Sequence, residues 1–80
     1  MSAIRQFRLR APGFWVDVRL YQLNGRWLAS ADAPEGPTLR TGYSPLAALT
    51  EALEPFDGDI DQLLESAPAD IRFTKRFLDY

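Results

Sequence analysis

Two runs of alternating polar and apolar residues are separated by only two residues, Asn24-Gly25, and this spacing constrains the chain more than any other feature. Residues 14–23 and 26–31 each repeat with a period of two, which is typical of β-strands that bury one face. Asn-Gly is the strongest short hairpin signal, because both residues tolerate positive φ angles. The chain is therefore predicted to contain an antiparallel hairpin that buries alternate side chains, namely Phe14, Val16, Val18, Leu20, Trp27, Ala29 and Ala31.

Further strands extend this hairpin on both sides. Residues 3–11 alternate in the same way, with Phe7 and Leu9 on one side, and Pro12-Gly13 then breaks the run. After a connection rich in turn residues, residues 38–41 can form a short fourth strand. The runs follow one another through short connections, which predicts an antiparallel meander sheet of three to four strands.

Helical signals dominate the second half of the chain. Ser44 can cap the first free amides of a helix, and Pro45 takes the first helical position, where its missing N–H costs nothing. Pro55 ends this helix, and Asp59 is predicted to cap a second, short helix with Gln62 as its capping-box partner. The order β-β-β-β-α-α defines an α+β fold with helices on one face of the sheet. The first helix is expected to bury one apolar stripe, formed by Leu46, Leu49, Leu53 and Phe56.

The 80 residues are enough for one domain with a single small core. We assign residues 1–69 to this α+β domain and residues 70–80 to a C-terminal tail of aromatic and basic side chains. The spacing in the tail fits either a helix or an extended segment. Exposed aromatic clusters are rare on small proteins. We therefore expect the tail to dock on the domain itself or on a partner chain through Phe73, Arg76, Phe77 and Tyr80.

The chain has no cysteine and no histidine. Zinc fingers, iron–sulfur clusters and catalysis by Cys–His or Ser–His–Asp groups therefore lie outside its chemistry. The acidic run 57–61 lacks the glycine and glutamate positions of an EF-hand loop, and the N-terminus of the second helix explains its carboxylates. The five glycines are spread singly through turns, so no phosphate-binding loop is present. We expect no enzyme activity, no cofactor, no metal and no small-molecule substrate.

No apolar stretch approaches the ~20 residues that span a bilayer, and no signal-peptide core follows the N-terminal arginines. The lack of cysteine fits a reducing compartment. We expect no membrane association and a cytoplasmic location.

Charge is divided unevenly along the chain, although the formal net charge is only −2. Residues 1–42 carry +3, whereas residues 43–80 carry −5. The predicted strands are therefore basic and the helices acidic. If the apolar side chains of the strands face the helices, the opposite face of the sheet presents the candidate binding residues Arg8, Arg10, Trp15, Arg19, Tyr21 and Arg26.

Two functions fit such a basic and aromatic sheet face. Exposed Trp and Tyr side chains mark protein interfaces. The chain is therefore predicted to be a non-catalytic module that binds a protein partner or forms a homo-oligomer, with the sheet edges and the tail as contact surfaces. Arginines interleaved with aromatic rings also suit single-stranded nucleic acid, whose phosphates meet guanidinium groups while its bases stack on rings. Both alternatives stay open at this point.

A further pattern runs through residues 26–54. A strand leads into Asp32-Ala33-Pro34-Glu35-Gly36, and after a short strand Gly42-Tyr43-Ser44 opens a helix. This pattern resembles the HicB-like antitoxin domain, which has an Asp-x-Pro-Gly turn, one residue shorter than here, and Gly-x-Ser/Thr before its helix. The resemblance implies a partial RNase H-like β-β-β-α fold that neutralises a small RNA-cleaving toxin by binding it.

Overall fold

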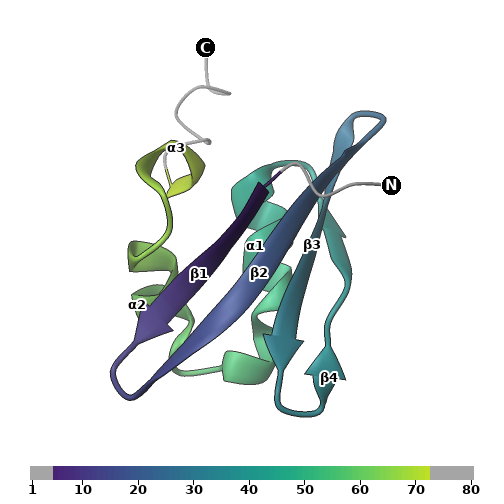
Figure 1. Ribbon diagram of the computed structural model, residues 1–80. Coiled ribbons are helices and arrows are strands. Elements are labelled where there is room, and N and C mark those ends of the chain that lie inside the picture. Colours follow the sequence, from purple (N-terminus) through teal and green to yellow (C-terminus); the bar gives the residue numbers. More distant parts are fainter. Residues whose placement is uncertain (1–4, 73–80) are drawn as a thin grey trace.

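The computed structural model describes residues 5–72 and places the strands before the helices (Figure 1). Three longer strands come first, β1 (Arg5–Ala11), β2 (Phe14–Leu23) and β3 (Arg26–Ala33). Two short strands follow, β4 (Gly36–Pro37) and β5 (Arg40–Gly42). The remaining elements are the helix α1 (Pro45–Ala52), the 3-10 turn η1 (Glu54–Phe56) and the short helices α2 (Ile60–Glu65) and α3 (Ala69–Arg72).

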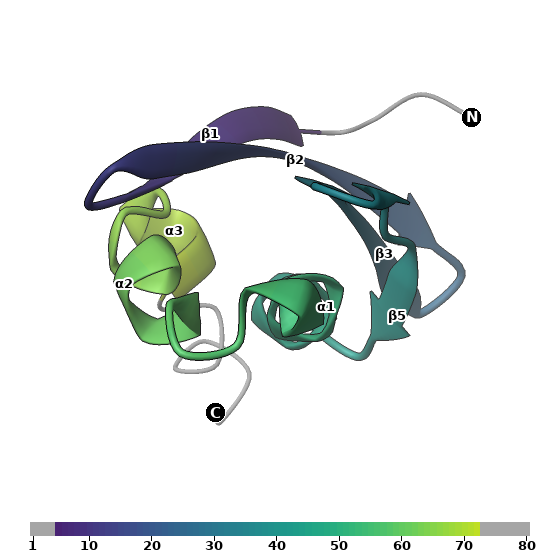
Figure 2. The same ribbon diagram turned by 90° about the horizontal axis from the view of Figure 1, so that it is seen from below.

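The strands form one antiparallel sheet, and the helices cover one of its faces (Figure 2). β1 pairs with β2, β2 pairs with β3, and β3 pairs with both β4 and β5. The long strands are joined in sequence order by two-residue turns, so the sheet is a meander. The α+β class and the meander sheet predicted from the alternating runs are confirmed.

Both hairpin turns depend on a glycine. Pro12-Gly13 connects β1 to β2, and Asn24-Gly25 connects β2 to β3, with φ of 87° at Gly13 and 71° at Gly25. The hairpin predicted at Asn24-Gly25 is confirmed, and of its two turn residues Gly25 alone has a positive φ. Within residues 5–72, only glycines have positive φ. A negative φ followed by a positive one is the pattern of a type II turn, which needs glycine at its second central position alone.

The fourth strand is interrupted at Thr38. β4 and β5 pair with β3 in one continuous register. Between them, the Thr38 N–H donates to the Ala31 carbonyl at 2.8 Å, whereas the Ala31 N–H donates to the Thr38 hydroxyl at 3.1 Å. In a regular ladder the Ala31 N–H would donate to a main-chain carbonyl, and here the Thr38 hydroxyl takes the place of that carbonyl. The strand predicted over residues 38–41 is therefore two short segments that begin two residues earlier.

The Thr38 hydroxyl also reaches the helix layer. It donates to the carbonyl of Ala52, the last residue of α1, at 2.8 Å. Carbonyls at a helix C-terminus have no partner inside the helix, and Thr38 is buried. One buried hydroxyl therefore joins the edge of the sheet to the end of α1.

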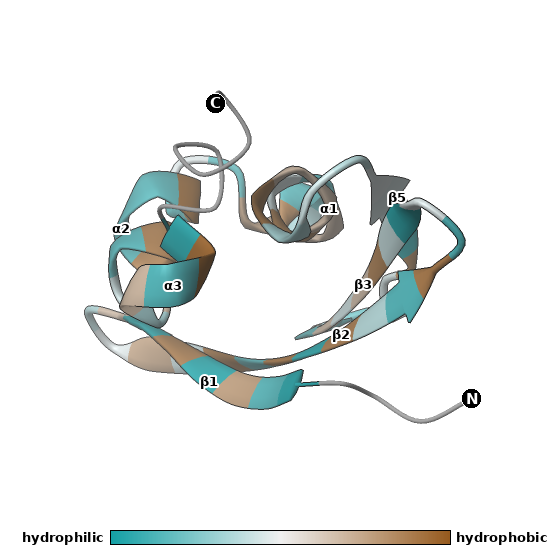
Figure 3. Cartoon of the chain, turned by 90° about the horizontal axis from the view of Figure 1, so that it is seen from above, coloured by the Kyte–Doolittle hydropathy of each residue, from teal (hydrophilic) through white to brown (hydrophobic). Residues whose placement is uncertain are grey.

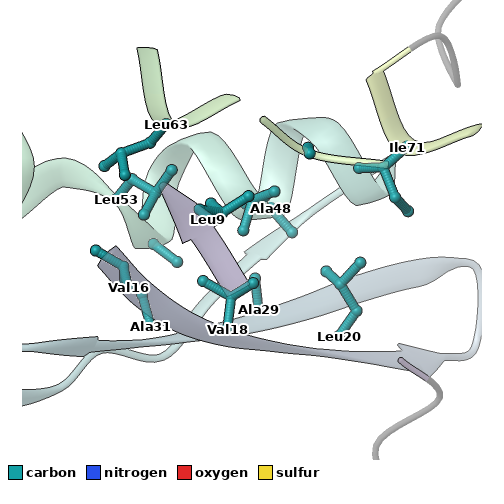
Figure 4. Close-up of a cluster of buried hydrophobic side chains, with 13 residues drawn as sticks. Leu9, Val16, Val18, Leu20, Ala29, Ala31, Ala48, Leu53, Leu63 and Ile71 are labelled. Atoms are coloured by element: carbon teal, nitrogen blue, oxygen red, sulfur yellow. The ribbon is translucent and has the colours of Figure 1, made fainter. Parts of the chain in front are cut away.

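The core lies between the sheet and the helices (Figure 4). Trp27 on β3 is half-buried and packs against this core. The alternation of polar and apolar residues along β1 and β2 that places side chains here is visible in Figure 3. The sheet contributes Leu9, Val16, Val18, Leu20, Ala29 and Ala31, as predicted. The helical half contributes Ala48, Leu49, Ala52, Leu53, Leu63, Ala67 and Ile71.

The predicted cap of the first helix is confirmed, whereas that of the second is wrong. The Ser44 hydroxyl accepts the Ala47 N–H at 3.0 Å, from an extended backbone with φ −144° and ψ 162°. Asp59 holds the N-cap position of α2, but its side chain makes no capping hydrogen bond. Its backbone angles are φ −113° and ψ 0°. A capping side chain normally projects from extended backbone, so the capping box with Gln62 does not form.

Gly42 lies where β5 and α1 come closest. A Cβ atom at this position would stand 2.5 Å from the nitrogen of Ala48 and 2.9 Å from the carbonyl carbon of Ala47. Both neighbours are backbone atoms, which cannot turn aside as a flexible side chain would. Space therefore requires glycine here, and the contact sets the distance between the sheet edge and α1.

Gly42→Ala is expected to lower the free energy of unfolding by about 3 kcal/mol, because its methyl group forces β5 and α1 apart. Urea unfolding followed by circular dichroism measures the change. Gly58→Ala is the matched control, since its Cβ would meet nothing within 4 Å and only its φ of 95° opposes alanine. That backbone strain costs about 1 kcal/mol. Equal losses in the two variants would contradict the packing role of Gly42.

Thr38→Val replaces the hydroxyl by a methyl group of similar size and leaves the Ala31 N–H and the Ala52 carbonyl without this partner. We expect a loss of about 2–4 kcal/mol in the free energy of unfolding, since each buried unpaired polar group costs about 1–3 kcal/mol. Thr38→Ser keeps the hydroxyl and should lose less than half as much. If Thr38→Val is as stable as wild type in urea, the hydroxyl does not join sheet and helix energetically.

Candidate interaction surface

The helices leave one face of the sheet uncovered (Figure 2). The strand register and the burial of the alternate residues place all six residues predicted for binding on this face. Side chains alternate along a strand, so this outer sheet face consists of even-numbered residues on β1 and β3 and odd-numbered residues on β2. Four of the predicted residues are exposed on it and two are half-buried. The exposed ones are Arg8, Arg10, Trp15 and Arg26, and the half-buried ones are Arg19 and Tyr21.

Two of these arginines are paired with aspartates on neighbouring strands. Arg8 on β1 stands opposite Asp17 on β2, and its Nε and Nη2 donate to the two carboxylate oxygens at 2.8 and 3.3 Å. Arg19 on β2 donates to Asp32 on β3 at 2.5 Å. Both arginines were expected to be available positive charges, but the register of the strands neutralises them. The outer sheet face is thus less basic than its arginines alone suggest.

Hydrogen bonding within the pairs favours the charged forms of Arg8, Asp17 and Arg19. The bond from Arg8 lowers the pKa of Asp17 below its ordinary value of 3.8 and raises the pKa of Arg8. The bond to Asp32 likewise raises the pKa of Arg19. The side chains of Arg8 and Asp17 are nearly half exposed, so water screens their attraction and the pair contributes little to stability. The main effect of the pairs is on the charge that a partner meets.

Trp15 and Arg10 form an open corner of the outer sheet face. Trp15 is 61% exposed, and the Arg8 guanidinium lies 4.7 Å from the centre of its ring, within the range of cation–π contacts. Arg10 stands opposite Trp15 in the register and has no ion-pair partner among residues 5–72. A hollow of about 400 Å³ lies at this corner, lined by Arg8, Arg10, Ala11, Gly13, Phe14 and Trp15.

Two exposed apolar side chains, Leu39 and Tyr43, were not among the binding residues predicted from the sequence. They are 58% and 76% exposed. When the register of β3 with β5 is continued by one residue at each end, both side chains fall on the outer sheet face, with Tyr43 opposite Arg26. The Arg26 guanidinium lies 5.1 Å from the centre of the Tyr43 ring and donates to its hydroxyl at 3.4 Å. Leu39 lies in the strand predicted over residues 38–41 and Tyr43 two residues beyond it, so alternation continued past that strand was the one signal in the sequence. Together with two half-buried neighbours they form an apolar strip of Tyr21, Leu28, Leu39 and Tyr43.

The two edges of the sheet, which were also predicted to be contact surfaces, are partly closed. On the β1 edge, the Arg10 N–H donates to the Ser66 hydroxyl at 2.7 Å. On the opposite edge, Pro37 has no N–H, and the Arg40 side chain donates to the Leu39 carbonyl at 3.0 Å. Such features hinder the addition of a strand from another chain. Of the contact surfaces predicted within residues 5–72, the outer sheet face is therefore the more open to a partner.

The predicted contact residues of the tail, Phe73, Arg76, Phe77 and Tyr80, lie outside the described residues. The part of the tail that the structure describes belongs to α3, on the helix side of the sheet (Figure 2). Ile71 is buried there in the core, and Asp70 forms an ion pair with Arg5 at the start of β1.

Comparisons with known proteins identify no family: no protein-family model, curated protein or solved structure matches the chain. Within residues 5–72, no three His, Cys, Asp or Glu side chains gather as a metal site, and no helix is long and apolar enough to cross a membrane. The HicB-like resemblance of residues 26–54 stays a prediction. Two of its residues have roles within the fold, since Gly42 admits the backbone of α1 and Ser44 caps that helix.

The pKa of Asp17 is expected below 3.8 in the folded protein, and Arg8→Gln should return it toward that value. A lowered carboxyl pKa stabilises the fold above the ordinary pKa, and this contribution is lost as the pH falls through the lowered value. NMR titration of the Asp17 carboxyl carbon measures the pKa directly. Arg10→Gln, on the same strand, is the control and should leave it unchanged. If the pKa of Asp17 is the same in Arg8→Gln as in wild type, the pair does not persist in solution.

Proposed function

We propose that this protein is a small non-catalytic module that binds another protein chain through its outer sheet face. The observation that carries the proposal is the combination of neutralised arginines and exposed apolar side chains on one face. Arg8 and Arg19 are paired with aspartates, while the aromatic and aliphatic side chains beside them are more than half exposed at Trp15, Leu39 and Tyr43. Aromatic side chains and arginine are the residues enriched in protein interfaces.

The outer sheet face has few unpaired positive charges, and this favours protein binding over nucleic-acid binding. A protein that binds nucleic acid neutralises several phosphates with Lys or Arg side chains. On the described outer sheet face, Arg10 and Arg26 are the arginines without a carboxylate partner, and Arg26 is stacked on Tyr43. Two such charges at separate corners support few phosphate contacts.

The class of partner follows from the same surface. The outer sheet face can be covered by any apolar and aromatic protein surface. Its partner can therefore be a second copy of the chain or a different protein. The HicB-like resemblance adds a small RNA-cleaving toxin as a specific candidate for a different protein. We place this binding in the cytoplasm, in keeping with a chain that has no cysteine.

Single-stranded nucleic acid is the second candidate ligand, and the corner formed by Trp15 and Arg10 favours it. An exposed indole ring can stack on a base while a neighbouring guanidinium contacts the phosphate. The hollow of about 400 Å³ beside Trp15 offers space for such a contact. This function would use one corner of the outer sheet face rather than the apolar strip.

Fluorescence anisotropy of a labelled single-stranded oligonucleotide at two salt concentrations separates the two functions. We expect no saturable binding by the wild-type protein at physiological salt. Asp17→Asn combined with Asp32→Asn releases Arg8 and Arg19, and this variant should bind with an affinity that falls steeply as salt rises. Salt-dependent binding by wild type that disappears in Trp15→Ala would instead establish the second candidate and overturn the first.

A further inference from the structure

We infer that the partner of the outer sheet face is a second copy of this chain, packed face to face about a two-fold axis with the two β3 strands antiparallel. This inference rests on the proposed function and names both the partner and its arrangement. The observation that carries it is the order of outward side chains along β3, which is basic at one end, apolar and small in the middle, and acidic at the other. In sequence order these side chains are Arg26, Leu28, Ser30 and Asp32. The two charged ones are exposed, whereas Leu28 is half-buried and Ser30 is buried between its neighbours.

This order is self-complementary when two copies meet antiparallel. Reversing one β3 over the other brings the basic end of each strand to the acidic end of its counterpart. Arg26 then faces Asp32 of the second copy, and the two-fold axis repeats the contact. Because the residues are six positions apart on a strand that rises about 3.3 Å per residue, the two contacts lie about 20 Å apart. They therefore fix the direction of the second copy as well as its position.

The ion pairs of the outer sheet face allow two identical faces to approach. Arg8 with Asp17 and Arg19 with Asp32 are already neutralised within one chain, so Arg10 and Arg26 are the unpaired positive charges that each face brings to the contact. Like charges placed opposite each other across an interface are strongly unfavourable. Asp32 can accept hydrogen bonds from Arg19 of its own chain and from Arg26 of the second copy, since a carboxylate has two oxygens.

Other surfaces of the described chain fit a second copy less well. The sheet edges are obstructed by Ser66 on one side and by Pro37 on the other. The helix layer exposes acidic side chains, which would repel their equivalents in another copy. These are Glu51, Glu54, Asp57, Asp61 and Glu65. Self-association through the outer sheet face avoids both obstacles.

The curvature of the sheet limits the size of the contact. The sheet bends around the helices, so its outer face is convex (Figure 2). Two convex faces touch along a strip, and the apolar strip defined above lies on both sides of β3. On one side of β3, Tyr21 of β2 stands opposite Leu28. On the other side of β3 lie Leu39 and Tyr43. Stable interfaces bury about 800 Å² per partner, so a narrower contact implies a dimer that dissociates on dilution.

Charge reversal at the two facing positions tests the arrangement. Arg26→Glu sets an acidic side chain against Asp32 of the second copy, and Asp32→Lys sets a basic one against Arg26. Each variant alone should dimerise at least about tenfold more weakly than wild type. An equimolar mixture should regain the wild-type association, because every facing pair then has opposite charges. Analytical ultracentrifugation up to millimolar concentration measures all four samples.

Glu51→Lys, a charge reversal on the exposed face of α1, is the control and should associate like wild type. Circular dichroism verifies that each variant is folded. A wild-type protein that stays monomeric at millimolar concentration overturns this inference, whereas binding of a different protein by the same face remains intact. If both variants dimerise more weakly and their mixture does not regain the wild-type association, Arg26 does not face Asp32 of the second copy. Salt-sensitive oligonucleotide binding by wild type is the separate result that overturns the proposed function itself.

Discussion

Backbone meets backbone where β5 passes the first turns of α1, and the missing side chain at Gly42 makes this approach sterically feasible. Only Tyr43 and Ser44 separate the strand from the helix, so α1 begins in contact with the strand that it has just left. Its other end is tied back by the Thr38 hydroxyl, which donates to the Ala52 carbonyl. A helix held at both ends has one orientation over β3, and the burial of its apolar side chains follows from that orientation.

The ion pairs of the outer sheet face link the strand register to the surface chemistry. Arg8 and Asp17 connect β1 to β2, and Arg19 and Asp32 connect β2 to β3. A shift of one residue between two strands would turn the side chains of one strand to the other face. The register that buries the apolar side chains therefore also brings these pairs together and removes positive charge from the surface. A chain whose first half is basic thus presents a face on which two of the four arginines are neutralised, with apolar side chains exposed beside them.

Local signals predicted most of the fold, and features that depend on distant contacts could not be predicted. Alternation placed Val16 and Trp15 on opposite faces, and the Ser44-Pro45 cap is a property of adjacent residues. Thr38 interrupts its strand because its hydroxyl has partners on β3 and α1, which no local pattern reveals. The residues of the outer sheet face were predicted from alternation alone. Their neutralisation was not, since it requires knowing which aspartate on a neighbouring strand stands within reach of each arginine.

The two tryptophans occupy opposite sides of the same sheet. Trp27 packs against the core, whereas Trp15 is 61% exposed on the outer sheet face. An indole in the core loses its apolar surroundings when the chain unfolds, and an indole on the outer face changes its surroundings when a partner covers it. Intrinsic emission from single-tryptophan versions of this protein therefore reports folding from one side of the sheet and docking from the other, with no added dye.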